Sequence, residues 1–565
     1  YLTFIASYRD AGLFPGDLVR GERDRYVTLV LPLIAHSGIE PVRAFLALHV
    51  AGIWLLLLGV WLLTRTISSD DRAPWLATSF ASLGAQRLLA FTMMSENIFM
   101  LRDLTTGPLL CAAALLLRGR PIAALALAGT LFNVHPLSSV NFVAIALPLA
   151  FLRRTGGSVR AGLVACAAFA VTALPCLGWA LLHGDAPLVG APPDWVDVLR
   201  ERSAHHLFPS TWNGKTWLAF AALPAVAAVA LVAGHPQLRR AATLGLLAST
   251  LAVFVAGWTF AELLPVGFVL QSQLFRASFF LAAVALALVS DLATRALDRA
   301  PRLAAPAVAV LGGALVVGDL RAVLPAIALA LLCAGGRLRM VGGALAIGTA
   351  TWAAASALGL KLPSGNVAWR ILLDAPENRR IISGAALLTV PLAVGVGHRA
   401  ARAAAGMLAV GIAAAPAVQV WAAARPDASL VDVWRDRVAS SRSTEDDRMC
   451  EWVRRNLSRD AVLLVPVDAT MIRPACERTV VVTYKDGTLS NFSPRFARRW
   501  RERHRALRNL RHESAPAIAA LAQRFGATHL RWDDARTLNL PLAHHEGRMR
   551  LYAIASQRRA AASAP

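Results

Sequence analysis

The chain has 565 residues, 56% of them hydrophobic, and its 58 Lys and Arg against 35 Asp and Glu give a net charge of +23. So many long uncharged runs exclude a purely soluble globular protein and predict a polytopic membrane protein. In such a chain the positive charge favours positive-inside loops and contact with anionic membrane lipid over binding of nucleic acid.

The first 42 residues form a predicted external loop ahead of the first full-length apolar span. They contain two carboxylates, Asp10 and Asp17, in a turn-rich stretch around Phe14-Pro15-Gly16. A short apolar run, Tyr26–Ala35, follows and is too short to cross a bilayer at roughly 20 residues per helix. This order is typical of an active site at a membrane surface and equally of an ordinary connecting loop. Because the chain begins with Tyr1 rather than Met, we expect more sequence upstream, including a spanning helix.

Candidate spans follow one another up to residue 421. We place them at Ala44–Thr64, Trp75–Met93, Leu104–Leu117, Ile122–Phe132, Leu137–Leu152, Ala161–Leu182, Trp217–Ala233, Ala241–Trp258, Ala277–Val289, Leu303–Val317, Ala322–Cys333, Met340–Leu360, Ile382–Val396 and Ala403–Trp421. Several fall short of a full crossing and are expected to extend into flanking residues or to be re-entrant.

The distribution of arginine predicts the orientation. With residues 1–25 outside, the inside loops each carry at least two arginines; they are 65–72, 118–120, 153–160, 235–240, 291–302, 336–339 and 398–402. The long loop 183–215 and everything after residue 424 then lie outside. We therefore expect a transmembrane domain over 1–424 and an extracytoplasmic domain over 425–565.

The C-terminal domain has the alternation of a small soluble α/β domain. Helices are expected near Met449–Leu457, over the strongly basic Pro494–His512 and over Ser514–Phe525, with strands at Ala461–Val467, Thr479–Tyr484, Thr528–Trp532 and Arg548–Ile554. Cys450 and Cys476 both fall in this domain, where oxidation is permitted, so the pair can form a disulfide.

Three patterns suggest ligands and are weighed against plainer explanations. Gly395–Ala400 fits G-x-G-x-x-A, but it ends a membrane span and no acidic residue follows about 20 positions on, so we expect no dinucleotide. His205-His206 and His544-His545-Glu546 lack metal-ligand spacing, and the sequence predicts no certain cofactor while leaving a divalent metal open. The arginines of 494–512 suit anionic lipid, a charged glycan or a plain solvated face.

Ionisable residues at the outer ends of spans are the candidate site. His135 precedes Pro136 at a span end, where it is either functional or part of a helix-ending turn. Arg102 and Arg276 suit a phosphate group, because the guanidinium fork can bond two oxygens, or else they extend to lipid headgroups. Three further polar residues share the predicted outer side: Glu96, Asp103 and Gln271.

The layout resembles the GT-C class of membrane glycosyltransferases. The residues that carry the resemblance are Asp10–Asp17, the turn His135-Pro136-Leu137, and a run from Glu451-Trp452-Val453 through Val465-Pro466-Val467 and Arg473 to Thr483-Tyr484-Lys485. These stretches are more closely similar to an uncharacterised bacterial membrane family with GT-C-like architecture. The class shows its key acidic residue directly after the first span, a position that falls at or before Tyr1 here.

The resemblance implies an all-α polytopic transmembrane domain with a C-terminal soluble α/β domain, in the bacterial inner membrane. It implies a glycosyltransferase that uses a polyprenyl-phosphate-linked sugar at the outer face, with Asp17 as general base or metal ligand and Asp10 second. Arg102, His135 and Arg276 would hold the donor phosphate, with Glu96 and Gln271 nearby. The alternatives are a transporter or flippase for a lipid-linked or polyanionic substrate, and a non-catalytic membrane scaffold; the absence of repeated halves mildly favours the enzyme.

Overall fold

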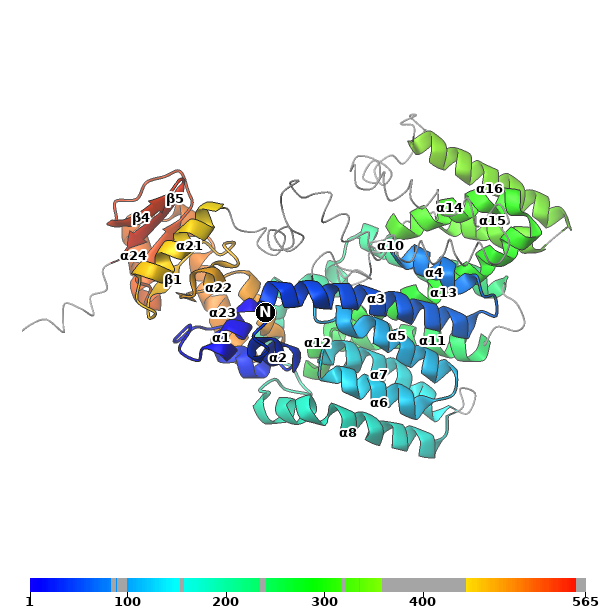
Figure 1. Ribbon diagram of the computed structural model, residues 1–565, viewed down its shortest axis with the longest axis horizontal. Helices are drawn as coiled ribbons and strands as arrows, with labels where there is room; N and C mark the ends of the chain where they lie inside the picture. Colours follow the sequence, from blue (N-terminus) through cyan, green and yellow to red (C-terminus); the bar gives the residue numbers. More distant parts are fainter. Residues whose placement is uncertain are drawn as a thin grey trace, which may run out of the picture.

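The computed structural model describes residues 1–82, 88, 99–152, 157–233, 240–317, 322–334, 336–357 and 444–554. It consists of a bundle of apolar helices with a small sheet-containing domain at one end (Figure 1). The expected fold class, a helical membrane domain followed by a C-terminal α/β domain, is confirmed. The last two predicted spans, Ile382–Val396 and Ala403–Trp421, and the glycine motif at 395–400 lie outside the described residues.

The N-terminal segment lies beside the α/β domain (Figure 1). It contains α1 (Leu2–Arg9), the 3₁₀ turn η1 (Arg20–Arg25) and the short apolar helix α2 (Val30–His36). We call the end of the bundle next to this segment the domain-side end.

Twelve helices of the bundle are described. They are α3 (Pro41–Ile67), α4 (Ala73–Ser82), α5 (Asp103–Leu117), α6 (Pro121–Phe132), α7 (Pro136–Phe151), α8 (Val159–His183), α10 (Gly214–Val232), α11 (Arg240–Trp258), α13 (Ser278–Arg299), α14 (Pro301–Val317), α15 (Val323–Ala334) and α16 (Gly336–Ala357). Within the described ranges, four stretches are long and apolar enough to cross a membrane: Pro41–Ile67, Val159–His183, Ala241–Leu263 and Leu274–Arg299.

Glycines let two of these helices approach closely. A Cβ added to Gly107 on α5 would lie 2.0 Å from the Leu55 carbonyl oxygen on α3, and one added to Gly59 would lie 2.3 Å from the Gly107 carbonyl oxygen. Small residues at such a crossing replace side-chain packing with backbone contact, as in other membrane helix pairs. The helix α13 is buried along its whole apolar length, so it is the centre of the bundle.

Arginine-rich loops that the sequence places on one side meet at the end of the bundle away from the α/β domain. Arg72 pairs with Asp298 at 2.6 Å, which joins the α3–α4 loop to the end of α13. Arg118, after α5, donates to the Thr66 hydroxyl at the end of α3 over 3.1 Å. The clustering of these loops at one end agrees with the parity that the arginine pattern predicts.

The stretch 183–215, expected to be a loop, contains the helix α9 (Pro193–Leu207) and the turn η4 (Pro209–Thr211). The sequence analysis missed this helix because its apolar face is narrow and its other residues are mostly charged or polar. On that face, Trp195 and Leu199 are fully buried against the α/β domain. Three short elements connect α11 to α13: a π-helical turn η5 (Thr259–Leu263), α12 (Gly267–Ser272) and η6 (Leu274–Ala277).

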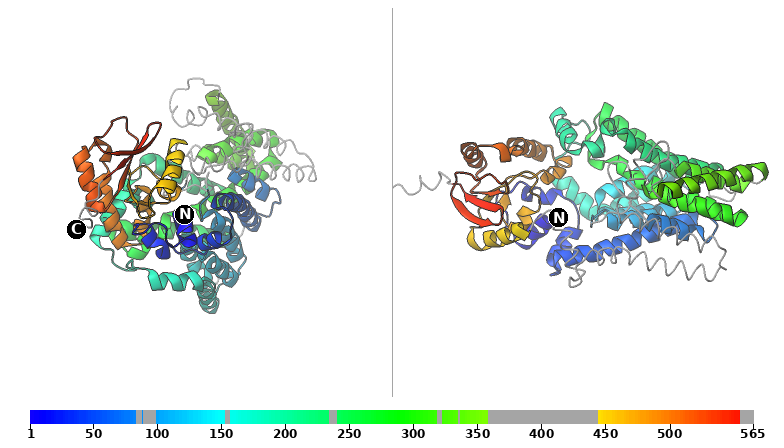
Figure 2. Two further views of the ribbon diagram at one scale, coloured as in Figure 1. Left: turned by 60° about the vertical axis from the view of Figure 1, so that its left-hand side comes forward. Right: turned by 90° about the horizontal axis from the view of Figure 1, so that it is seen from above.

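The α/β domain holds a five-stranded sheet of order β2-β1-β3-β5-β4 (Figure 2). Strand β1 is parallel to β2 and β3, whereas β5 is antiparallel to both β3 and β4. Its elements are α21 (Thr444–Asn456), β1 (Val462–Leu464), α22 (Ile472–Cys476), β2 (Thr479–Val480), η8 (Lys485–Asn491), α23 (Pro494–Leu507), η9 (Leu510–His512), α24 (Ala515–Phe525), β3 (His529–Trp532), β4 (Leu542–Glu546) and β5 (Met549–Ala553). The four expected strands are confirmed in shortened form, and β4, which contains His544-His545-Glu546, was missed.

The two faces of the sheet pack against different cores. Leu463 joins a small cluster with Met449 and Ile472 from α21 and α22. Leu464, the next residue, points the other way and joins a large cluster that also includes Phe4 of α1 and Trp195 of α9. The α/β domain therefore shares its main core with the N-terminal segment and α9, while a domain boundary at 424/425 stays a prediction.

The basic helix α23 faces α9, whose acidic residues pair with its arginines. Arg498 pairs with Asp194, and both Arg501 and Arg505 pair with Glu201, at 3.1 and 2.9 Å. These three arginines join α9 to the α/β domain, while Arg495, Arg499 and Arg508 of the same stretch are exposed.

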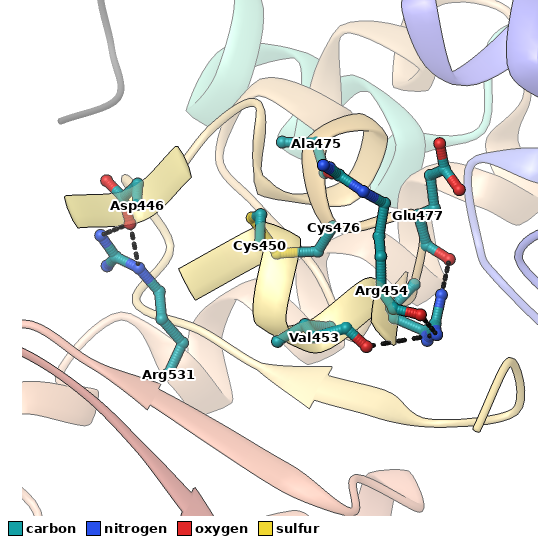
Figure 3. Close-up of a disulfide and its surroundings, with 9 residues drawn as sticks. Asp446, Cys450, Val453, Arg454, Ala475, Cys476, Glu477 and Arg531 are labelled. Carbon is teal, nitrogen blue, oxygen red and sulfur yellow. Dashed lines mark hydrogen bonds and ion pairs between the residues drawn. A yellow bond between two sulfur atoms is a disulfide. The ribbon is translucent and has the colours of Figure 1, made fainter. Parts of the chain in front are cut away.

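The expected disulfide between Cys450 and Cys476 is present and joins α21 to α22 (Figure 3). Both cysteines are buried in the smaller core, beside Arg454, which donates to the Ala475 carbonyl oxygen. The bridge spans 26 residues, and a loop of this length restricts the unfolded chain by roughly 3–4 kcal/mol in the chain-entropy model.

We predict that Cys450→Ser lowers the melting temperature of the full-length protein in detergent, because the unfolded chain regains that freedom. Reduction with a membrane-permeant thiol should lower the melting temperature of the wild type to that of the variant. Cys333→Ser, which alters a free cysteine, is the control for the loss of a buried sulfur. Equal melting temperatures for Cys450→Ser and wild type would contradict the stabilising role.

Candidate functional site

A cavity at the domain-side end of the bundle brings together three of the residues that the sequence singled out. Its wall is formed by Leu88, Arg102, Thr106, His135, Leu137, Ser138, Asn141, Arg276 and Phe279. Arg102 immediately precedes α5, His135 precedes α7, and Arg276 lies just before α13. Three helix N-termini thus surround the cavity, and their positive dipole ends add to the guanidinium charges.

His135 is held by the helix that follows it. Its Nδ1 accepts a hydrogen bond from the backbone N–H of Ser138 over 3.3 Å and lies 2.8 Å from the Ser138 hydroxyl. A backbone N–H can only donate, so Nδ1 is unprotonated in this arrangement, and a neutral imidazole carries its proton on Nε2. His135 is therefore both the N-cap of α7 and a hydrogen-bond donor available to the cavity.

Arg276 is placed by an unusual backbone turn. Gln273 between α12 and η6 is buried with φ of +49°, a left-handed conformation that non-glycine residues rarely adopt. The chain reverses there, so that η6 carries Arg276 to the cavity wall. The buried Nε of Arg276 has no hydrogen-bond partner among the described residues, and its guanidinium forms no ion pair with them.

Arg102 has a carboxylate beside it. Its Nε lies 3.9 Å from Oδ1 of Asp103, the first residue of α5, and both side chains are almost fully buried. The other oxygen of Asp103 accepts the Met100 backbone N–H at 2.9 Å and lies 4.0 Å from Nδ1 of His49. The cavity wall therefore has two guanidinium groups and an imidazole, and the Asp103 carboxylate lies beside Arg102 without being part of the described wall.

Asp17 does not line this cavity. Its side chain is fully buried, and Oδ2 accepts from Nε of Arg473 at 2.7 Å and from the Val480 backbone N–H at 3.1 Å. The guanidinium of Arg473 also bonds both oxygens of Asp486 at 2.8 Å. Through these contacts, Asp17 joins the N-terminal turn to the α/β domain. A catalytic role for Asp17 stays a prediction that this geometry does not favour.

The remaining expected site residues also lie apart from the cavity wall. Asp10 pairs with Arg459 of the α/β domain at 2.9 Å and is partly exposed. Gln271 donates from Nε2 to the backbone oxygens of Gly267 and Pro187, so it braces α12. Glu96 lies outside the described residues.

The sequence missed the polar residues that complete the wall. Thr106, Ser138 and Asn141 lie one or two helical turns inside apolar helices, where a single polar residue gives no local signal. The helical spacing was the available signal: Thr106 follows Arg102 by four positions, and Ser138 and Asn141 follow His135 by three and six. In the part of the chain that the structure describes, no group of three His, Cys, Asp or Glu could hold a metal ion.

Comparison with known proteins gives one short family match and one distant structural likeness. Residues 444–507 match a family model described as a domain of unknown function (DUF6798). No curated protein matches the chain. The crystal structure of ArnT from Cupriavidus metallidurans in the apo state is 13% identical, with a TM-score of 0.42, and the match covers 98% of this chain and 93% of that one. A likeness at this level leaves the function to be argued from the site.

We predict that Asp17→Asn lowers the melting temperature, because the buried Arg473 loses one of its two carboxylate partners. We expect the free energy of unfolding to fall by roughly 2–3 kcal/mol. The control is Asp10→Asn, whose ion pair is partly exposed and contributes roughly 0–1 kcal/mol. Thermal unfolding of both variants in the same detergent measures the difference. A wild-type melting temperature for Asp17→Asn would show that the Arg473 contact does not hold the two parts together.

Proposed function

We propose that this chain is a GT-C-type membrane glycosyltransferase that takes a sugar from a polyprenyl-phosphate carrier. The observation that supports it best is the cavity of Arg102, His135 and Arg276 at one end of an apolar bundle. A phosphate monoester or diester with a long apolar tail matches such a site, because its charge binds to the guanidinium groups while its tail stays among apolar helices.

The proposed reaction needs what the cavity offers. The acceptor hydroxyl attacks the anomeric carbon of the sugar, a C–O bond forms, and the bond from that carbon to the phosphate oxygen breaks. The electron pair leaves with the phosphate, whose added negative charge Arg102 and Arg276 stabilise. His135 donates from Nε2 to a phosphate oxygen and fixes its position.

The proton of the acceptor hydroxyl needs a base. The geometry favours Asp103 over Asp17 and Asp10, because Asp103 stands beside Arg102 whereas the others bond to arginines of the α/β domain.

The orientation follows from the same proposal. The arginine-rich loops at the far end of the bundle would face the cytoplasm of a bacterial cell, and the cavity and the α/β domain would lie on the outer side of the inner membrane. The substrate would then be a lipid of the outer leaflet, and transfer would occur outside the cytoplasm.

We predict that Arg276→Ala weakens binding of radiolabelled polyprenyl phosphate by roughly tenfold or more, since a charged hydrogen bond is worth about 1.5–3 kcal/mol. Arg43→Ala, an exposed arginine beside Glu40 near the start of α3, is the matched control and should bind normally. Unchanged affinity of Arg276→Ala, with its melting temperature also unchanged, would overturn the phosphate site.

We predict that Asp103→Asn keeps this binding and loses transfer, measured as release of unglycosylated polyprenyl phosphate from a sugar-loaded carrier. Removing a positioned base costs roughly 10²–10⁴-fold in rate. If the protein is instead a transporter lined by the same residues, the wild-type protein will also release no unglycosylated carrier. Absence of release by the wild type would therefore favour the transport alternative.

A further inference from the structure

The structure contains an exposed apolar surface that the catalytic proposal does not use. Two short segments form it, 186–190 after α8 and 263–268 around the start of α12, and neither contains a charged residue. Its most exposed side chains are Leu188, Val189, Leu263, Leu264 and Phe268, from 46% to 77% accessible. We call these two segments the apolar platform. Patches of this kind mark interaction surfaces.

Backbone hydrogen bonds join the two segments of the platform to each other. The N–H of Gly267 donates to the Val189 oxygen at 2.7 Å, and that of Phe268 donates to the Leu188 oxygen at 3.0 Å. The Ala191 N–H bonds to the Pro265 oxygen at 3.2 Å, and a Cβ at Gly267 would lie 1.9 Å from the Pro187 oxygen. Each such hydrogen bond lowers the cost of placing irregular backbone in a low-dielectric layer.

Charged residues that flank the platform turn toward the protein. Asp185 accepts from the Ser493 hydroxyl of the α/β domain at 2.9 Å and lies 3.6 Å from Arg25. Glu262 pairs with Arg200 at 3.1 Å and accepts the Ser210 N–H at 2.9 Å. The flanking carboxylates are therefore bound to η1, α9 and the α/β domain, while the apolar side chains of the platform are exposed.

The platform is continuous with membrane-spanning segments. One of its segments follows Val159–His183, and the other begins at the last residue of the apolar stretch Ala241–Leu263. Trp179 and Trp258 lie near those two ends, each more than two-fifths exposed, as in the aromatic belt at a bilayer surface. Figure 1 shows α12 at the domain-side end of the bundle.

We propose that the apolar platform is immersed in the acyl chains of the adjoining membrane leaflet and binds lipid there directly. Its side chains extend the lipid-facing surface of the spanning helices beyond their ends. Because α12 leads through Gln273 to Arg276, this contact sets the depth of the cavity relative to the leaflet. The proposal does not depend on the transferase activity.

The test is the depth of a fluorophore on the platform of the full-length protein in liposomes. Cys111 and Cys166, which are free and partly exposed, are first replaced by alanine. A nitrobenzoxadiazole group is then placed on Val189→Cys, or in a second variant on Phe268→Cys. Lipids with a spin label on the acyl chain serve as quenchers. Leu542→Cys on β4, which is 52% exposed on the α/β domain, is the matched control.

Immersion predicts that the spin-labelled lipids quench roughly half of the emission at both platform positions and little at the control. A blue-shifted emission maximum should accompany the quenching. Quenching at the platform no greater than at Leu542→Cys would overturn the proposal. Efficient disulfide crosslinking between two copies of the unlabelled Val189→Cys variant would also overturn it, because a second protein copy would then cover the platform. Wild-type melting temperatures show that each variant is folded.

Discussion

A buried arginine shared by two carboxylates joins the N-terminal segment to the α/β domain. Arg473 on α22 bonds Asp17 on one side and Asp486 on the other. The backbone N–H of Val480 also donates to Asp17, and that of Thr483 donates to Asp486. Burial lowers the pKa of Arg473, but the two carboxylate charges outweigh it and raise the pKa well above its usual value. Two carboxylates offset the cost of burying this cation, so the contact fixes the N-terminal segment against the α/β domain.

The same rule separates structural arginines from the proposed site. Arg473 and Arg531 are buried, and each has a carboxylate within 3.0 Å. Arg276 has no carboxylate partner among the described residues, and its buried Nε has no hydrogen-bond partner there. A guanidinium kept in low dielectric without a protein carboxylate is well matched to an anionic ligand, because ligand binding supplies the missing charge. Arg202 and Arg478 are also buried without a carboxylate partner in the described part of the chain, but they bond backbone oxygens, whereas Arg276 lines a cavity.

The sequence predicted what local signals encode. Arg102, His135 and Arg276 were selected because each is ionisable at the end of an apolar span, and the parity of the spans placed them on one side. Parity does not by itself bring them together; their convergence was expected from the proposed function. Three helices and four strands of the α/β domain were visible in periodicity and turns, whereas α22 was not. The partner of Asp17 was not, because Arg473 is 456 positions away and nothing in the spacing of either residue marks the pair. The helix α9 was missed for a related reason. Its narrow apolar face packs against the α/β domain, and the sequence of α9 alone does not indicate that contact.

Contacts of α9 also connect the position of the α/β domain to the cavity. Arg202 on α9 donates to the Tyr484 carbonyl oxygen at 3.0 Å, and its guanidinium lies over the Tyr484 ring. Two residues earlier, Arg200 pairs with Glu262 of η5 on the bundle side. From η5 the chain passes through α12 and the left-handed Gln273 to Arg276. One helix thus bonds the domain through Arg202 and, through Arg200, the segment that leads to Arg276. The α/β domain is in this sense part of the site, even though it contributes no side chain to the described cavity wall.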